Sequence, residues 1–174
     1  DRQPEHTQLD LEMSFVHQDD VMLLVEGLYK HITYEILGNN YKQNNKDFVR
    51  LSYEESIERF GTDKPDLRFG MELVTISEEL KNTESNVFNH VLNQGGVIRG
   101  IVAPGAGDYD RKKTDELIDL AKSSGASGLV YILFDNDFVS IENIKDENYK
   151  SPLKKFLNVD VVKGLAKKMS AKPG

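Results

Sequence analysis

The stretch that points most directly to a fold is QLDLEMSFV, residues 8–16, in which apolar and polar side chains alternate without a break. In an extended chain, Leu9, Leu11, Met13 and Phe15 fall on one side and the polar residues between them fall on the other. Alternation of this length is typical of a β-strand with one buried face. We therefore predict a strand over residues 8–16, with its polar side turned away from the core.

An amphipathic helix is predicted directly after this strand, over residues 19–37. Gly38 is its predicted C-cap, because glycine readily takes the backbone conformation that ends a helix. A polar loop is expected over residues 39–46 and an extended stretch over 48–51. The helical apolar positions are Val21, Leu24, Val25, Leu28 and Ile32.

Two capping-box patterns predict shorter helices further along the chain. Ser52 and Glu55 have the spacing of an N-cap and its reciprocal partner, so we expect a helix to residue 60 that ends at Gly61. The same spacing over residues 75–78 predicts a second short helix to about residue 81. The polar residues 82–85 then form the expected boundary between two domains, 1–83 and 84–174.

The second predicted domain alternates between strands and helices. Glycines and prolines separate these elements, as at the Gly-rich loop 104–108 and the helix start at Ser151-Pro152. The order favours an α+β domain of two layers, with helices on one face of a mainly antiparallel sheet. The expected strands are 97–102, 129–134 and a hairpin return over 138–141, and the expected helices are 112–124 and 159–169.

Composition excludes several classes of protein. The 174 residues carry a net charge of −7, so non-specific nucleic-acid binding is disfavoured outside local basic patches. There are no cysteines, which excludes disulfides and thiolate metal sites and fits a cytoplasmic location. No apolar run reaches the roughly 20 residues that span a bilayer, and there is no leader pattern. Because residue 1 is Asp rather than Met, we expect a piece of a larger protein.

The polar side chains at the amino end form the first candidate site. Gln8 and Asp10 share the polar face of the predicted strand with His6, and Arg2 and Gln3 lie just before it. Arg2 could contact a phosphate with two hydrogen bonds, and Asp10 could hold an ammonium group. A half-solvated strand is the simpler interpretation of the spacing alone.

The second candidate is the charged loop around Pro65, which carries Asp63, Lys64, Asp66 and Arg68. Proline stiffens such a loop, so its charges could be presented to a ligand or to another domain. A solvated turn explains the composition equally simply.

Other motifs carry weaker signals. Residues 104–107 lack the Gly-Lys-Ser/Thr ending of a phosphate-binding loop, which favours a structural turn. The four histidines have no metal-ligand spacing, so no metal site is predicted. Lysines make the carboxyl end basic, and they could touch RNA phosphates or simply solvate a helix face. These lysines are Lys154, Lys155, Lys163, Lys167, Lys168 and Lys172.

Taken together, three blocks resemble bacterial-type aspartyl-tRNA synthetases. DRQPEHTQLDLEMSF, residues 1–15, resembles the end of motif 2 in that family, and RFGTDKPDLR, residues 59–68, is similar to the loop that follows it. From about residue 86, stretches such as SPLKKFL at 151–157 resemble the inserted GAD domain. The resemblance implies an α+β fold, in which part of the class II antiparallel catalytic sheet precedes a two-layer α+β GAD domain.

Residue by residue, the resemblance implies an ATP site and an aspartate site. Arg2 matches the residue that meets the ATP phosphates, and Gln3 matches another ATP contact. His6 departs from the family pattern, because phenylalanine usually stacks on adenine there. Gln8 and Asp10 match the amino-acid pocket. The loop with Asp63, Lys64, Asp66 and Arg68 is expected to border the active-site mouth or the acceptor end of tRNA.

The implied parent protein is a homodimeric, cytoplasmic ligase that activates aspartate with ATP and Mg²⁺ and transfers it to the 3′ end of tRNA. Motif 1, the first half of motif 2, motif 3 and the anticodon-binding barrel would lie outside these residues. We therefore expect the chain by itself to be inactive and to bind no cofactor. The alternative is a non-catalytic tRNA-binding or regulatory module built on a GAD domain, and a metal-dependent hydrolase ranks last.

Overall fold

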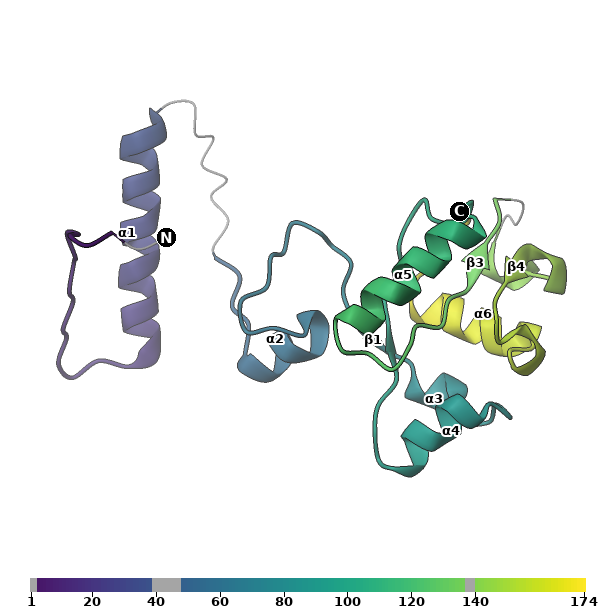
Figure 1. Ribbon diagram of the computed structural model, residues 1–174. Coiled ribbons are helices and arrows are strands. Elements are labelled where there is room, and N and C mark those ends of the chain that lie inside the picture. Colours follow the sequence, from purple (N-terminus) through teal and green to yellow (C-terminus); the bar gives the residue numbers. More distant parts are fainter. Residues whose placement is uncertain (1–2, 39–47, 137–139) are drawn as a thin grey trace. The chain divides into compact units, whose positions relative to one another are not determined.

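The computed structural model describes residues 3–38, 48–136 and 140–174, and the chain divides into two compact units (Figure 1). Unit 1 is Asp1–Arg50 and unit 2 is Leu51–Gly174. The predicted domain boundary between residues 83 and 84 falls inside unit 2 and stays a prediction. The predicted loop at residues 39–46 lies outside the described residues.

Unit 1 is organised by one long helix, α1 (Gln18–Leu37), which confirms the helix predicted from apolar spacing. His17 is the N-cap, and its backbone N–H donates to the Asp20 carboxylate at 2.8 Å. At the other end, Gly38 has a φ of 53° and donates its backbone N–H to the Tyr34 carbonyl. Glycine ends the helix there because it takes positive φ without steric cost.

The strand predicted over residues 8–16 is wrong for the described structure. This segment is neither helix nor strand, and its side chains are exposed, Leu9 by 65% and Leu11 by 53%. A strand exists only where a second strand receives its backbone hydrogen bonds, and no strand among the described residues pairs with it. Phe15 also bends the chain, with a φ of 58°. Residues 8–16 therefore join no antiparallel sheet within the described residues.

A buried carboxylate joins the two described segments of unit 1. Glu26 on α1 is only 9% exposed and accepts hydrogen bonds from Lys30 at 2.8 Å and from the Phe48 backbone N–H at 3.2 Å. Arg50 adds an ion pair at 3.2 Å. The hydrogen bond from Lys30 lowers the pKa of Glu26, followed by the one from Phe48. Glu26 therefore ties residues 48–50 to the helix while remaining ionised at neutral pH.

Unit 2 begins with α2 (Tyr53–Phe60), the helix that the first capping-box pattern predicts. The Ser52 hydroxyl accepts the Glu55 backbone N–H at 3.0 Å, and Gly61 ends the helix with a φ of 71°. Both local signals are satisfied by neighbours in sequence, so this prediction is confirmed.

The second capping-box pattern predicts a helix that is present, but its capping residue is wrong, because Thr75 belongs to a strand. β1 (Val74–Thr75) pairs antiparallel with β2 (Arg99–Gly100), so that Thr75 lies opposite Arg99. The helix that follows, α3 (Ser77–Leu80), starts from Ile76 without a side-chain cap. The Thr75 hydroxyl instead donates to Glu58 at 3.1 Å. Pairing with a distant strand outweighs the local cap, and β2 covers only part of the predicted strand 97–102.

From residue 86 onward, the described part of unit 2 holds three α-helices, three short 3₁₀ turns and a second small sheet. α4 (Asn86–Asn93) precedes β2, and α5 (Arg111–Ser123) starts at Asp110, whose carboxylate accepts the Lys113 N–H at 2.9 Å. α5 and the last helix, α6 (Val159–Lys168), confirm the helices predicted near 112–124 and 159–169. Three short 3₁₀ turns link them: η2 (Ile141–Asn143), η3 (Asp146–Asn148) and η4 (Lys154–Phe156).

The predicted hairpin return at 138–141 is not the partner of the strand before it. β3 (Leu133–Phe134) pairs antiparallel with β4 (Tyr149–Lys150), with Phe134 opposite Tyr149. Residues 137–139 lie outside the described residues, and Ile141 belongs to η2. The segment at Ser151-Pro152 leads into η4 rather than into an α-helix. Alternation alone does not say which later segment supplies the backbone partner.

One apolar core holds unit 2 together. α6 packs against α3 and η2, so residues on both sides of position 83 share this core. At its centre Tyr149 is 1% exposed, and its hydroxyl donates to the Leu157 carbonyl at 2.7 Å. Burial raises the pKa of Tyr149 to about 12. The buried core side chains are Ile76, Leu80, Phe88, Ile144, Tyr149, Leu157, Val162, Leu165 and Ala166.

The chain is thus a mixed α+β protein with small antiparallel sheets, as predicted at the level of fold class. The two-layer arrangement of residues 84–174 stays a prediction. Within the described residues, no helix combines the length and the apolar character that crossing a membrane requires.

Gly107 offers a test of this packing. A Cβ placed on Gly107 would lie 2.1 Å from the Phe134 carbonyl oxygen, whereas a Cβ on Gly128 would meet nothing within 4 Å. We expect Gly107→Ala to lower the free energy of unfolding by about 1–3 kcal/mol, the usual cost of overpacking. Gly128→Ala should leave it unchanged or slightly higher. Urea unfolding followed by circular dichroism measures both, and equal midpoints would contradict the close approach.

Candidate functional site

The first candidate group lies on the extended segment before α1. Gln3, His6, Gln8 and Asp10 are all exposed, and Arg2 lies outside the described residues. The Gln8 amide donates to the Asp10 carboxylate at 2.5 Å. Side chains two residues apart share a face in an extended chain, so the structure brings these two together as the alternating pattern predicts.

This pair has a defined chemical capacity. A carboxylate attracts an ammonium group, and the amide beside it offers both a donor and an acceptor. Open to water, such a pair binds weakly, because solvent competes for every hydrogen bond. Selective binding at Gln8 and Asp10 would therefore need further surfaces that exclude water around them.

The second candidate group lies in unit 2, on the loop after α2. Two hydrogen bonds fix the ends of this loop. At its start, the hydroxyl of the buried Ser56 donates to the Thr62 carbonyl at 2.8 Å. At its end, the Leu73 backbone N–H donates to the Arg59 carbonyl at 2.8 Å. The loop therefore leaves α2 and returns to it at defined points.

The Arg59 side chain reinforces this closure. Its Nε and Nη2 donate to the two oxygens of Glu72 at 2.8 and 2.7 Å, and its Nη1 donates to Glu55 at 2.5 Å. The guanidinium carbon also lies 5.0 Å from the centre of the Phe60 ring. A two-point contact of this kind fixes orientation as well as distance. Glu72 and then Glu55 raise the pKa of Arg59, and Arg59 lowers the pKa of Glu72.

At the tip of the loop, Arg68 and Asp66 form a local ion pair. Arg68 Nε donates to the Asp66 carboxylate at 2.8 Å, and the Arg68 backbone N–H donates to it at 3.0 Å. The side-chain hydrogen bond from Arg68 lowers the pKa of Asp66. Asp63 and Lys64 are exposed, and neither has an ion-pair partner among the described residues. The structure thus pairs two of the four predicted charges and leaves the other two facing solvent.

Sequence reasoning missed three contacts of this arrangement. Arg59 and Glu55 stand four residues apart on α2, so their contact was open to prediction. Glu72 is 13 residues from Arg59 and Ser56 is an unremarkable serine, so neither carries a local signal. The loop geometry follows from these non-local contacts rather than from Pro65 alone.

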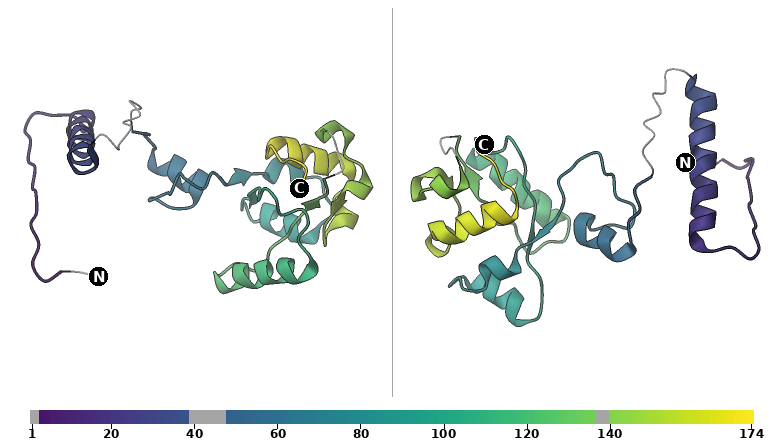
Figure 2. Two further views of the ribbon diagram at one scale, coloured as in Figure 1. Left: turned by 90° about the horizontal axis from the view of Figure 1, so that it is seen from above. Right: turned by 180° about the vertical axis from the view of Figure 1, so that it is seen from behind.

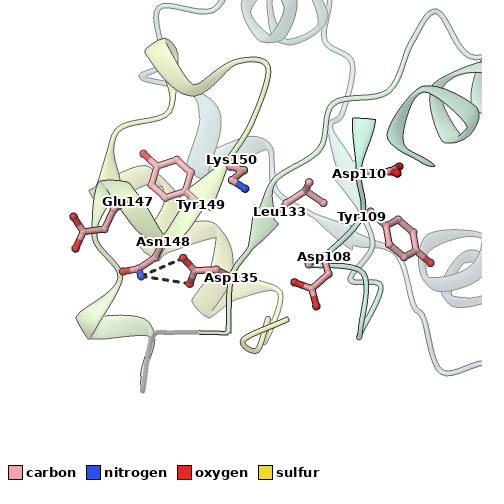
Figure 3. A pocket seen from close by; sticks show the side chains of 10 residues that line it. Asp108, Tyr109, Asp110, Leu133, Asp135, Glu147, Asn148, Tyr149 and Lys150 are labelled. Carbon is pink, nitrogen blue, oxygen red and sulfur yellow. Dashed lines mark hydrogen bonds between the residues drawn. The ribbon is translucent and has the colours of Figure 1, made fainter. Parts of the chain in front are cut away.

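A separate polar pocket of about 260 Å³ lies in unit 2, between the loop before α5 and the β3–β4 sheet (Figure 3). Four of its lining residues are acidic: Asp108, Asp110, Asp135 and Glu147. Asn148 donates to both oxygens of Asp135 at 3.4 and 3.5 Å (Figure 3). Across residues 3–38, 48–136 and 140–174, no three His, Asp or Glu side chains are grouped so that they could hold a metal ion.

Comparison with known proteins assigns the family. Residues 1–158 match the family described as tRNA synthetases class II (D, K and N). The chain belongs to this class II synthetase family. It is 42% identical over 174 residues to the aspartate–tRNA(Asp/Asn) ligase of Dehalococcoides mccartyi and 41% identical over 174 residues to that of Rubrobacter xylanophilus. It is also 41% identical over 173 residues to the aspartate–tRNA ligase of Clostridium perfringens.

All of this chain, or 99% of it for the clostridial protein, takes part in these matches. The chain spans between 27% and 29% of the length of these curated relatives. Both candidate groups, at residues 3–10 and 63–68, fall inside the range that matches the synthetase family.

Replacing Arg59 tests whether it holds the loop of this synthetase chain. Arg59→Lys keeps the charge but cannot reproduce the two-point contact with Glu72. We expect amide hydrogen exchange to accelerate by about tenfold or more at Leu73 and across residues 62–72, with the rest of unit 2 unchanged. Arg111→Lys is the matched control, because Arg111 makes one exposed ion pair, with Asp115 at 3.6 Å. Unchanged loop protection in the Arg59 variant would refute this role.

Proposed function

We propose that this chain is part of an aspartate–tRNA ligase, which activates aspartate with ATP and transfers it to the 3′ end of tRNA. The observation that carries the proposal is the identity of 42% along the whole chain to proteins named aspartate–tRNA(Asp/Asn) ligase. Membership in the class II synthetase family supports it independently. Adenylate formation joins the aspartate carboxylate to the α-phosphorus of ATP and releases pyrophosphate. The terminal ribose hydroxyl of tRNA then attacks the aspartyl carbonyl carbon, forms the ester and releases AMP.

In this proposal the amino-terminal segment supplies ATP contacts. Arg2 meets the phosphates and stabilises the charge that develops on the α-phosphoryl oxygens during attack. Gln3 contacts the nucleotide, and the His6 imidazole stacks on the adenine ring. The described chemistry of Gln3 and His6 fits a purine, which offers a flat face and hydrogen-bonding edges.

Gln8 and Asp10 are proposed to hold the amino acid. Asp10 binds the substrate ammonium, and Gln8 keeps the Asp10 carboxylate oriented through the contact at 2.5 Å. Fixing the ammonium positions the substrate carboxylate for attack, which converts binding energy into proximity. Both side chains are exposed here, so the rest of the parent enzyme is proposed to enclose them. For that reason we propose that these 174 residues do not form the adenylate alone.

The loop with Asp63, Lys64, Asp66 and Arg68 is proposed to border the active-site mouth or the acceptor end of tRNA. Its ends are fixed by Arg59 and Ser56, so the charges are presented at low entropic cost. Residues 84–174 are proposed to form a GAD insertion domain. We further propose a homodimeric parent enzyme in the cytoplasm, where a chain without cysteines has no need of an oxidising compartment.

Magnesium is the usual partner of ATP in phosphoryl and nucleotidyl transfer. The described residues group no three acidic or histidine side chains as metal ligands, so none of them is assigned to the ion. The proposed role of Gln3 and His6 is to bind the nucleotide, and that of Gln8 and Asp10 is to bind aspartate.

Aspartate-dependent exchange of pyrophosphate into ATP tests the proposal most directly. The complete gene product that carries this sequence should show exchange with aspartate, and the 174-residue chain alone should show none. Exchange by the short chain would refute its proposed inactivity. A complete product that binds tRNA but shows no exchange would instead favour the non-catalytic module.

Asp10→Asn in the complete product tests the aspartate contact. Hydrogen bonds to charged groups contribute about 1.5–3 kcal/mol, so we expect the KM for aspartate to rise by about 10- to 100-fold. The KM for ATP should change little. Glu12→Gln, two residues further along the same face, is the matched control and should leave both values close to those of the unmodified protein. An unchanged aspartate KM in the Asp10 variant would overturn the assignment.

His6→Phe tests the adenine contact, and this replacement is expected to strengthen ATP binding rather than weaken it. Phenylalanine offers a larger aromatic face than imidazole, and an aromatic pair contributes about 0.5–1.5 kcal/mol. We expect the KM for ATP to fall by about 2- to 10-fold in the exchange reaction, with the KM for aspartate unchanged. His90→Phe on α4 serves as the control. A higher KM for ATP in the His6 variant would show that a ring nitrogen, not stacking area, makes the contact.

A further inference from the structure

Charge is distributed very unevenly along the chain. Residues 150–174 contain seven lysines and a single acidic residue, Asp160, which gives this segment a net charge of +6 in a chain whose total is −7. The remaining residues are therefore strongly acidic. A polyanion would be repelled by most of this protein and attracted to one end of it.

The fold turns part of this basic segment outward. Val162, Leu165 and Ala166 form the inner face of α6 and are buried in the core of unit 2. Because that face is fixed, the opposite face of the helix must point to solvent. Lys167 and Lys168 are exposed there, Lys163 is half-buried one turn earlier, and Lys172 is exposed just after the helix. Figure 2 shows α6 in yellow in unit 2. We name Lys163, Lys167, Lys168 and Lys172 the lysine face.

The lysine face contrasts with the arginines of the chain in its ion pairing. All five described arginines form an ion pair within 4 Å, such as Arg59 with Glu72 and Arg99 with Glu58. No member of the lysine face does so within the described part of the chain. Lysines without an ion pair to the described residues also occur on α5, but residues 150–174 are set apart because they hold seven lysines and only one acidic residue.

Helix stability explains them only in part. Lysines in the last turn of a helix interact favourably with its dipole, which accounts for Lys167 and Lys168. Lys163 and Lys167, however, stand four residues apart on one face, where like charges repel. Glu142 on η2 is the acidic group that both of them influence. One carboxylate near two of the four lysines leaves the face with excess positive charge.

We propose that the lysine face binds the phosphate backbone of tRNA. This inference rests on the proposed function, which makes tRNA a substrate of the parent enzyme. Phosphates along an RNA backbone are spaced regularly, and unpaired lysines along a helix and its exit can contact several of them without reading sequence. The acidic remainder of the chain then restricts how the RNA can approach, so the contact orients the substrate as well as holding it.

The test replaces Lys163, Lys167 and Lys168 with glutamine in the complete gene product and measures tRNA binding between 50 and 300 mM salt, about the range over which phosphate contacts lose affinity. Each lysine that neutralises a phosphate contributes about 0.9 to the slope of log Kd against log salt. We expect the slope to fall by about 2 to 3 and the Kd at the lowest salt to rise at least tenfold. Aspartate-dependent pyrophosphate exchange should stay unchanged, because it needs no tRNA.

A triple replacement of Lys112, Lys113 and Lys122 on α5 is the matched control, since it removes the same charge from exposed lysines without ion pairs in the described structure. Its slope should change by less than about 1. An unchanged slope in the α6 variant, or an equal fall in both variants, would overturn the inference. The α6 variant could also sediment with a smaller mass than the unmodified protein while its salt slope stays unchanged. That result would overturn the inference and indicate that the lysine face contacts a second copy of the protein. If the unmodified complete product shows no aspartate-dependent pyrophosphate exchange, the proposed function itself is refuted.

Discussion

The buried hydroxyl of Tyr149 is the contact on which unit 2 depends most. It donates to the Leu157 carbonyl at 2.7 Å while its backbone, in β4, pairs with Phe134 in β3. One residue thereby fixes the sheet relative to the start of α6. Because a buried phenol must satisfy its donor, this geometry admits few alternatives. The position of α6 in turn decides that Val162 and Leu165 face inward and that the lysines face outward.

Arg59 plays a comparable part for the charged loop. Arg59 binds Glu72 at the end of the loop and Glu55 on α2. Ser56 binds the Thr62 carbonyl at the start of the loop. A loop held in this way can present charge to a partner without first being ordered. The amino-terminal segment has no such support, since its only described side-chain contact is between Gln8 and Asp10. The two candidate groups therefore differ in how much of their geometry this chain supplies by itself.

Local signals predicted the helices well and the strands poorly. Ser52 with Glu55 and Gly61, and the apolar spacing before Gly38, place α2 and α1 correctly, because a helix satisfies its hydrogen bonds within a few residues. The strand predicted at 8–16 has no partner in the described residues, and β3 pairs with 149–150 rather than with 138–141. Alternation reports that a segment suits a sheet, not where its partner lies.

The sequence by itself determined the capped helices, the separation of an acidic chain from a basic carboxyl end, and a resemblance to aspartyl-tRNA synthetases that family membership confirms. Only the tertiary structure decided that Thr75 joins a strand and that Glu72 binds Arg59. It also decided that the lysines of α6 form no ion pair with the described residues. The physical reason is the separation in sequence between the residues that interact. Caps and helical turns are settled among neighbours, whereas strand pairing, ion pairing and burial depend on residues brought together by the fold.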